Sequence, residues 1–147
     1  MATRGLPAWP YTDATPEDLP PAERLLVDAA RAWAAACRRG EPTAPALRRL
    51  LATERAEAAA GPLDAMLRAL AQSAALTIGC ELCPRLVGEE APILLAVALA
   101  QRGRRREALA CLLKRLPNAQ TYSAMAAAIA VGCAFRAAGL RFNDPWG

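Results

Sequence analysis

The stretch EEAPILLAVALAQR at positions 89–102 most constrains what this chain can fold into. Glu89 and Glu90 open it, followed by Pro92, and the positive end of a helix favours carboxylates and tolerates proline in its first turn. The residues that follow are apolar on every side. A helix without a polar face must be buried all round, so other helices must pack around it. The sequence therefore predicts a central buried helix at about 89–102.

Composition indicates that the remaining elements are helices too. Hydrophobic residues make up 54% of the 147 residues, alanine is the most frequent of them, and only 5% are aromatic. Alanine is the best helix former, and β-branched residues are sparse. A chain of this length buries a sizeable core as one unit. We therefore predict a single all-α domain, 1–147, built as a compact bundle of about six antiparallel helices around the central one.

Glycine and proline divide the sequence into the other expected helices. Gly40 and the Gly61-Pro62 pair are predicted breaks, and Thr121 is a predicted N-cap for the last helix, which Gly139 ends. The predicted helices are 21–39, 43–60, 62–78, 105–116 and 121–138.

Both ends of the chain are expected to be non-helical. Repeated prolines make residues 1–20 an extended arm, and residues 140–147 form a short tail. Each end carries two aromatic side chains whose area is costly to leave in water. We expect both ends to pack on the bundle.

A Cys-x-x-Cys pair, Cys80 and Cys83 with Glu81 between them, is the sharpest candidate for chemistry. Such a pair can form a disulfide, bind a metal or hold a reactive thiolate. The expected position of Cys80, close to the C-terminal end of helix 62–78, disfavours a thiolate because that helix end is negative. The leading interpretation is therefore two small apolar residues in a tight turn. The alternative is a redox pair.

The same residues, GCELC at 79–83, resemble the active site of the all-helical alkylhydroperoxidase family, a Cys-x-x-Cys on a helix followed closely by a histidine. The resemblance implies thiol-based peroxide handling by Cys80 and Cys83. This sequence contains no histidine, so the family's partner residue has no counterpart. Glu81 could replace it near neutral pH only if burial raised its pKa strongly.

The sequence contains few residues that could form another kind of catalytic or cofactor site. Without histidine, no Ser-His-Asp or Cys-His arrangement exists, and no glycine-rich phosphate loop occurs. A zinc site usually takes four ligands, and Cys37, Cys111 and Cys133 are isolated within predicted helices. We expect no metal and no cofactor, and the expected class is not an enzyme.

Two further patterns concern binding. Residues 95–117 resemble one helix pair of a tetratricopeptide repeat, which supports a helical hairpin and mildly favours a binding scaffold. Arg104, Arg105 and Arg106 form a basic turn in a chain of net charge +4. Contacts with the phosphates of a nucleic acid are possible there, but the following helix lacks the polar residues that read base edges.

Localisation follows from absent signals. MATRGLPAWP contains no apolar segment typical of a secretory signal, and five cysteines are an odd number. The longest apolar runs, 91–100 and 124–135, are shorter than the roughly 20 residues of a membrane-spanning helix. We expect a cytoplasmic protein without a membrane span.

The expected function is a non-catalytic helical module for protein interaction or assembly. Alanine-rich helices leave flat apolar faces, which favours a homo-oligomer or a protein partner. The alternative is a thiol-based redox or peroxide-handling protein that uses Cys80 and Cys83. A third possibility is a basic nucleic-acid-binding protein.

Overall fold

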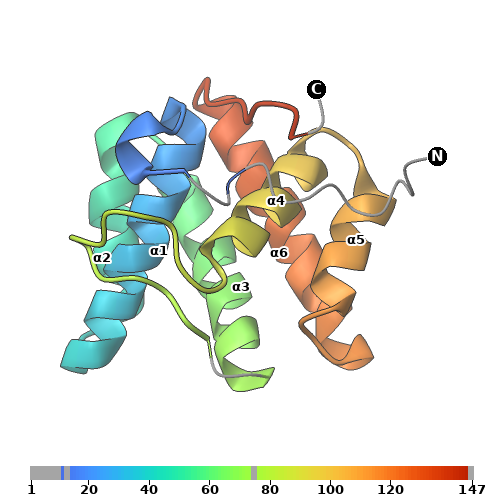
Figure 1. Ribbon diagram of the computed structural model, residues 1–147, viewed down its shortest axis with the longest axis horizontal. Coiled ribbons are helices and arrows are strands. Elements are labelled where there is room, and N and C mark those ends of the chain that lie inside the picture. The colour runs from blue at the N-terminus through green and yellow to red at the C-terminus, as the bar shows by residue number, and fades with distance from the viewer. Residues whose placement is uncertain (1–10, 12–13, 74–75, 146–147) are drawn as a thin grey trace.

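The computed structural model describes residues 11, 14–73 and 76–145. In these residues the chain forms six α-helices and no strand, which confirms the all-α fold class (Figure 1). Short 3-10 turns lie at Pro16–Asp18, Ala52–Glu54 and Glu57–Ala59. The helices are α1 (Pro21–Arg39), α2 (Thr43–Leu51), α3 (Ala60–Ser73), α4 (Glu90–Gln101), α5 (Arg105–Leu113) and α6 (Asn118–Ala137).

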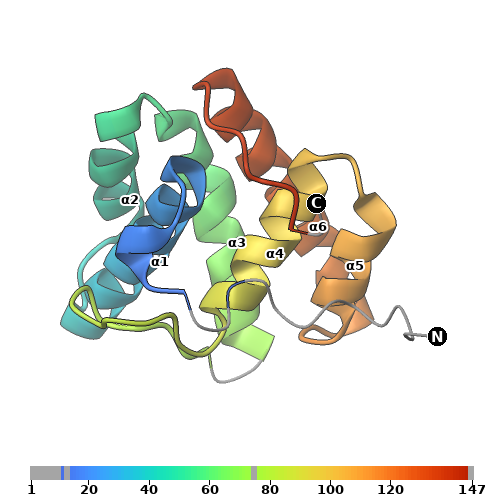
Figure 2. The same ribbon diagram turned by 45° about the horizontal axis from the view of Figure 1, so that its top comes forward.

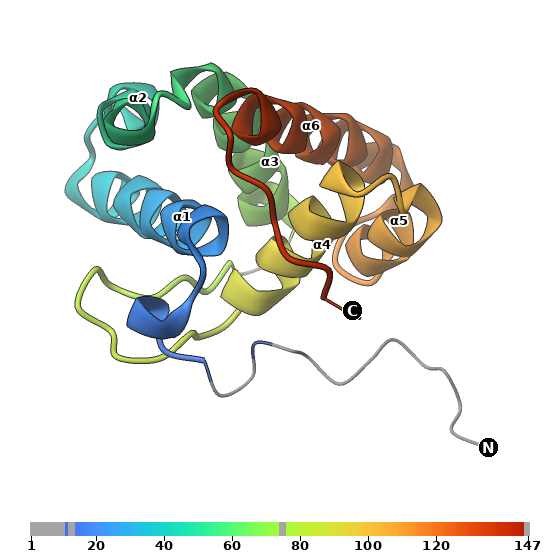
Figure 3. The same cartoon turned by 90° about the horizontal axis from the view of Figure 1, so that it is seen from above.

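Helix α4 lies at the centre of the fold, between α1 on one side and α5 and α6 on the other (Figure 3). Every residue from Ile93 to Ala100 is at most 6% exposed. Gly132 brings α6 close to α4, since a β-carbon there would lie 3.0 Å from the β-carbon of Gln101. The predicted buried helix at 89–102 is therefore confirmed, with its ends one residue inside the expected bounds.

The predicted break at Gly61-Pro62 is wrong. Helix α3 begins at Ala60 and includes both residues in its first turn, where the missing N–H of proline has no helical partner to lose. The predicted helix 43–60 instead stops at Leu51. Arg55 then takes a left-handed conformation with φ 59°, and the chain turns. Residues 52–59 supply few large apolar anchors, so packing did not extend α2 through them.

The bounds of three other predicted helices also differ. The helix expected over 105–116 ends at Leu113. A helix was expected over 62–78, but in the described residues α3 extends only to Ser73 and residues 76–89 form an irregular loop. The last helix begins at Asn118, so Thr121 lies inside it and is not its N-cap. The Thr121 hydroxyl donates to the Pro117 carbonyl oxygen, 2.9 Å away, one turn back.

The C-terminal segment crosses the outer side of α4 (Figure 2), and the side-chain amide of Gln101 is one of the groups that hold it. The Gln101 Nε2 donates to the carbonyl oxygens of Gly132 (2.9 Å) and Leu140 (3.0 Å). Its Oε1 accepts the N–H of Phe142 at 2.7 Å, and the buried Phe142 ring stacks on Phe135. The tail therefore packs on the bundle through Phe142, whereas Trp146 lies outside the described residues.

The N-terminal arm is described only at residue 11 and from residue 14 onward. Tyr11 is buried, at 7% exposure, and burial together with the charge of Glu23 raises its pKa to about 12. Trp9 lies outside the described residues. Within the described part of the chain, no helix is both long and apolar enough to cross a membrane.

Asp64 joins the first three helices. Its Oδ1 accepts hydrogen bonds from Trp33 Nε1 of α1 (2.8 Å) and Thr43 Oγ1 at the start of α2 (2.6 Å). Its Oδ2 accepts from Arg68 Nε at 2.8 Å. Burial opposes the charge, but the three donors prevail and lower the pKa of the Asp64 carboxyl.

Replacing this carboxylate should destabilise the protein. Asp64→Ala leaves the Trp33 N–H and the Thr43 hydroxyl without their acceptor, and we expect a loss of about 2 kcal/mol in the free energy of unfolding. Urea denaturation measures it.

The wild-type contribution of Asp64 should depend on pH. Because folding depresses the pKa, the contribution is complete above the ordinary value of 3.8 and is lost as the pH falls through the lower folded value. The difference between wild type and Asp64→Ala should therefore shrink below about pH 4. A pH-independent difference would contradict this explanation.

Candidate thiol site

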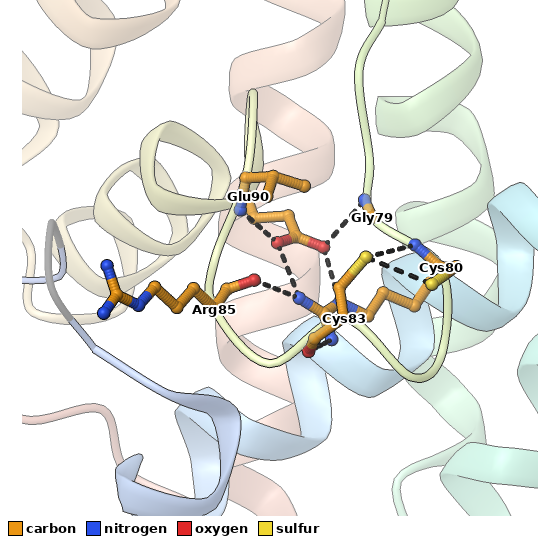
Figure 4. Close-up of polar contacts among 7 residues, drawn as sticks. Gly79, Cys80, Cys83, Arg85 and Glu90 are labelled. Carbon is orange, nitrogen blue, oxygen red and sulfur yellow. Dashed lines mark hydrogen bonds and ion pairs between the residues drawn. The ribbon is translucent and has the colours of Figure 1, made fainter.

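A buried ion pair between α1 and the start of α4 underlies the site (Figure 4). The Arg31 Nε lies 2.7 Å from Glu90 Oε2, and Arg31 Nη2 lies 3.0 Å from Glu90 Oε1. The two side chains are 2% and 0% exposed. This bidentate geometry is the strongest form of an arginine–carboxylate contact.

The same guanidinium and carboxylate groups also hold the backbone of the loop over residues 76–89. Arg31 donates from Nη1 to the carbonyl oxygen of Cys83 (2.9 Å) and from Nη2 to that of Arg85 (2.8 Å). Glu90 accepts the N–H of Gly79 (3.1 Å) and the N–H of Val87 (2.7 Å). The loop is thus fixed at several points along its length, although it contains no regular secondary structure.

The base of the loop is closed by Thr77 and Glu89. The Thr77 N–H donates to Glu89 Oε2 at 2.7 Å, and the Glu89 N–H donates to the Thr77 carbonyl oxygen at 2.9 Å. Gly88, the residue before Glu89, has φ +53°, and a β-carbon there would lie 2.2 Å from the Thr77 carbonyl oxygen. Only glycine fits this position.

Cys80 and Cys83 occupy a tight turn, residues 80–83, at the outer end of the loop (Figure 4), which we call the thiol turn. The Cys83 N–H donates to the Cys80 carbonyl oxygen at 3.1 Å. The two sulfur atoms are 3.1 Å apart, and the Cys80 N–H lies 3.2 Å from Cys83 Sγ. Cys80 is exposed and Cys83 is half-buried.

This placement corrects one expectation. Cys80 does not lie at the C-terminal end of a helix, because α3 is helical only to Ser73 in the described residues and an irregular segment follows. The negative end of a helix dipole therefore does not act on it. The two cysteines do lie in a tight turn, as the leading interpretation expected, and that turn is at the surface. The argument from the helix dipole against a thiolate at Cys80 is removed.

The two thiols differ in acidity. A hydrogen bond from Cys83, the backbone N–H groups of Leu82 and Cys83, and the nearby Arg31 charge together lower the pKa of the Cys80 thiol. The same sulfur–sulfur hydrogen bond raises the pKa of the Cys83 thiol, because Cys83 is then the donor. A thiolate therefore forms first at the more exposed sulfur, which is the form that reacts.

The other predicted site residues are not part of this cluster. Glu81 lies within the turn but is exposed, and it faces the charge of Arg39. Cys37 and Cys133 are exposed and Cys111 is buried. In the part of the chain that the structure describes, no three metal-ligating side chains come together.

The predicted basic turn is partly neutralised. Arg104 Nη2 forms an ion pair with Asp144 Oδ2 at 2.7 Å, whereas Arg105 and Arg106 are exposed. Binding of nucleic acid through these residues stays a prediction, and it requires a steep loss of affinity with added salt.

The sequence analysis missed Arg31, the residue that organises the site. A signal was present, because Arg31 follows Val27 by one helical turn and precedes Ala35 by another, and both neighbours are apolar. A charged residue within the apolar face of a helix must find a buried partner. Nothing in the sequence pattern identifies Glu90 as that partner.

No protein-family model, no curated protein and no solved structure matches this chain.

Removal of one member of the buried pair should destabilise the fold strongly. Arg31→Met leaves the Glu90 carboxylate buried and unpaired, and we expect a loss of about 3–5 kcal/mol in the free energy of unfolding. Urea denaturation of the reduced protein measures it. Arg24→Met is the matched control on the same helix, because the Arg24–Asp28 pair is 3.9 Å long and exposed. The control should stay near wild type, and equal losses would contradict the assignment.

Proposed function

We propose that this protein performs thiol–disulfide exchange, with Cys80 as the attacking thiol and Cys83 as the resolving thiol. The observation that carries the proposal is the pair of sulfurs 3.1 Å apart in a surface turn whose backbone is anchored to a buried ion pair. A disulfide requires the sulfurs to approach to about 2.05 Å. That short movement lies within the turn itself, so the bundle need not rearrange.

The asymmetry between the thiols gives the order of steps. The Cys80 thiolate attacks one sulfur of a disulfide on a partner molecule, forms a mixed disulfide and expels the other sulfur as a thiolate. Cys83 then loses its proton to solvent and attacks Cys80 Sγ, which expels the second thiolate. The Cys80–Cys83 pair is oxidised to a disulfide, the partner's disulfide is reduced to two thiols, and the released protons return to those thiolates.

Disulfide exchange is favoured over peroxide handling. Exchange needs a thiolate and an adjacent second thiol, and the turn contains both. Reduction of a peroxide also benefits from a proton donor to the leaving oxygen, and this sequence has no histidine to serve as one. Peroxide reduction by the same pair is therefore the second choice.

Oxidation should involve this pair alone. The native protein is equilibrated with mixtures of oxidised and reduced dithiothreitol, quenched in acid, and alkylated after unfolding. Of the five thiols, wild type should lose two together at a defined potential, and peptide mass spectrometry should locate the bond between Cys80 and Cys83. Cys80→Ser and Cys83→Ser should abolish the loss, while Cys37→Ser, which removes an exposed thiol elsewhere, should not. Oxidation only after unfolding would refute the proposal.

The reaction of Cys80 with iodoacetamide should report its acidity. We expect the midpoint of its pH–rate profile to lie below the ordinary thiol value of 9.0, because the folded protein lowers the pKa of Cys80. Cys83→Ala should raise that midpoint by removing the sulfur donor, and Cys37→Ser should leave it unchanged. An unchanged midpoint in Cys83→Ala would show that Cys83 does not stabilise the thiolate.

The predicted role in protein interaction or assembly is favoured by one feature outside the thiol turn. Two large apolar side chains are exposed on neighbouring helices, Leu113 of α5 (45%) and Tyr122 of α6 (71%). If this surface makes a homo-oligomer, the sedimentation coefficient should rise with protein concentration in the micromolar range, and Tyr122→Ser should reduce that rise. A monomer at all concentrations would contradict self-association.

A further inference from the structure

The surface around Cys80 is hollowed and offers a place for a partner molecule. A depression of about 460 Å³ lies between the C-terminal turn of α1 and the thiol turn. Ala35 and Leu82 supply apolar area, and Arg38, Arg39 and Glu81 supply charge. The Cys80 side chain lines the same depression, so a molecule bound there would lie next to the attacking thiol.

Leu82 is the most exposed large apolar residue in the described part of the chain, at 91%. It lies between the two cysteines in a turn whose carbonyl oxygens at Cys83 and Arg85 are held by Arg31. The leucine is thus presented on a fixed backbone, which lowers the entropy lost when a partner covers it. The exposed apolar surface of Leu82 contributes to binding when an apolar group of the partner covers it and removes it from water.

A second depression shares Arg38 with the first. It measures about 340 Å³, and Trp33, Leu76 and Ile78 contribute to its lining. Arg38 lines both depressions. A small disulfide would fill part of one depression, whereas a polypeptide segment can occupy both and cross Arg38 between them.

Charge indicates what should lie opposite Arg38. Arg39 is already engaged, because its Nε lies 3.0 Å from Glu41 Oε1 and it also faces Glu81. Arg38 is exposed, and no carboxylate of the described residues forms an ion pair with it. Arg38, which lines both depressions, therefore favours an acidic side chain on the partner.

We infer that the disulfide attacked by Cys80 belongs to a protein and is carried on an exposed segment with an apolar residue and a carboxylate close to the cysteine. The apolar residue packs on Leu82, and the carboxylate lies opposite Arg38. This inference rests on the proposed function, since it names the substrate class of the same thiol pair.

The test compares rates of exchange with synthetic peptide disulfides. The probes are the homodisulfides of acetyl-Glu-Phe-Cys-amide, acetyl-Lys-Phe-Cys-amide and acetyl-Glu-Ser-Cys-amide, with hydroxyethyl disulfide as the small neutral substrate. Each rate is divided by that of dithiothreitol with the same probe, which removes differences in leaving-group acidity. Wild type should prefer the Glu-Phe peptide to each other probe by on the order of tenfold, equivalent to about 1.4 kcal/mol.

Two variants assign the preference to residues. Leu82→Ser should remove the preference for phenylalanine over serine, and Arg38→Gln should remove the preference for glutamate over lysine. Leu113→Ser and Arg106→Gln replace an exposed leucine and an exposed arginine on α5, outside both depressions. These matched controls should retain both preferences.

The outcomes separate the inference from the proposed function. Exchange with no probe, hydroxyethyl disulfide included, would overturn the proposed function. Equal normalised rates for all probes would leave thiol–disulfide exchange standing and overturn the docking of an apolar, acidic segment. Preferences that survive both Leu82→Ser and Arg38→Gln would show that the partner binds elsewhere.

Discussion

The buried pair of Arg31 and Glu90 is the interaction on which the thiol turn depends. Taking two charges out of water costs several kcal/mol per ion, and the attraction between them repays that cost only when the remaining donors and acceptors are also satisfied. Here Arg31 donates to two loop carbonyl oxygens and Glu90 accepts two loop N–H groups. The ion pair thus completes its hydrogen bonds with loop backbone groups. The loop, which has no regular secondary structure, obtains hydrogen-bond partners for its backbone from the ion pair.

The rest of the bundle keeps that pair in place. Helix α4 carries Glu90 at its first residue, and its apolar body from Ile93 to Ala100 is buried against its neighbours. Helix α1 carries Arg31 at the middle of its length and is tied to α2 and α3 through Asp64. Because both helices are fixed by packing far from the loop, the site rests on rigid elements while the Cys80 sulfur stays at the surface.

Sequence reasoning succeeded where patterns are local and failed where packing decides. The all-α class and the buried segment 89–102 follow from composition and from the absence of a polar face, and α1 has the predicted bounds. The prediction of a helix over residues 52–59 was wrong because an alanine-rich sequence is compatible with a helix or with two short turns. Large apolar side chains that pack on the core decide between the two, and this segment has few of them. The prediction for residues 76–78 was wrong for a related reason. Ile78 has the spacing of a helical stripe, yet its side chain is buried while its backbone is irregular.

From the sequence alone one can predict the helical class, the buried central helix and the packing of the tail through Phe142, and one can see a pair of cysteines in a chain without histidine. Each of these follows from residue type or from spacing along the chain. The fold was needed to show that the sulfurs lie next to each other at the surface, that Cys80 is not at a helix C-terminus, and that Arg31 and Glu90 meet. Those two residues are 59 positions apart. Periodicity reports which face of a helix is buried, but the partner of a buried charge depends on how separate helices pack, and no local pattern encodes that.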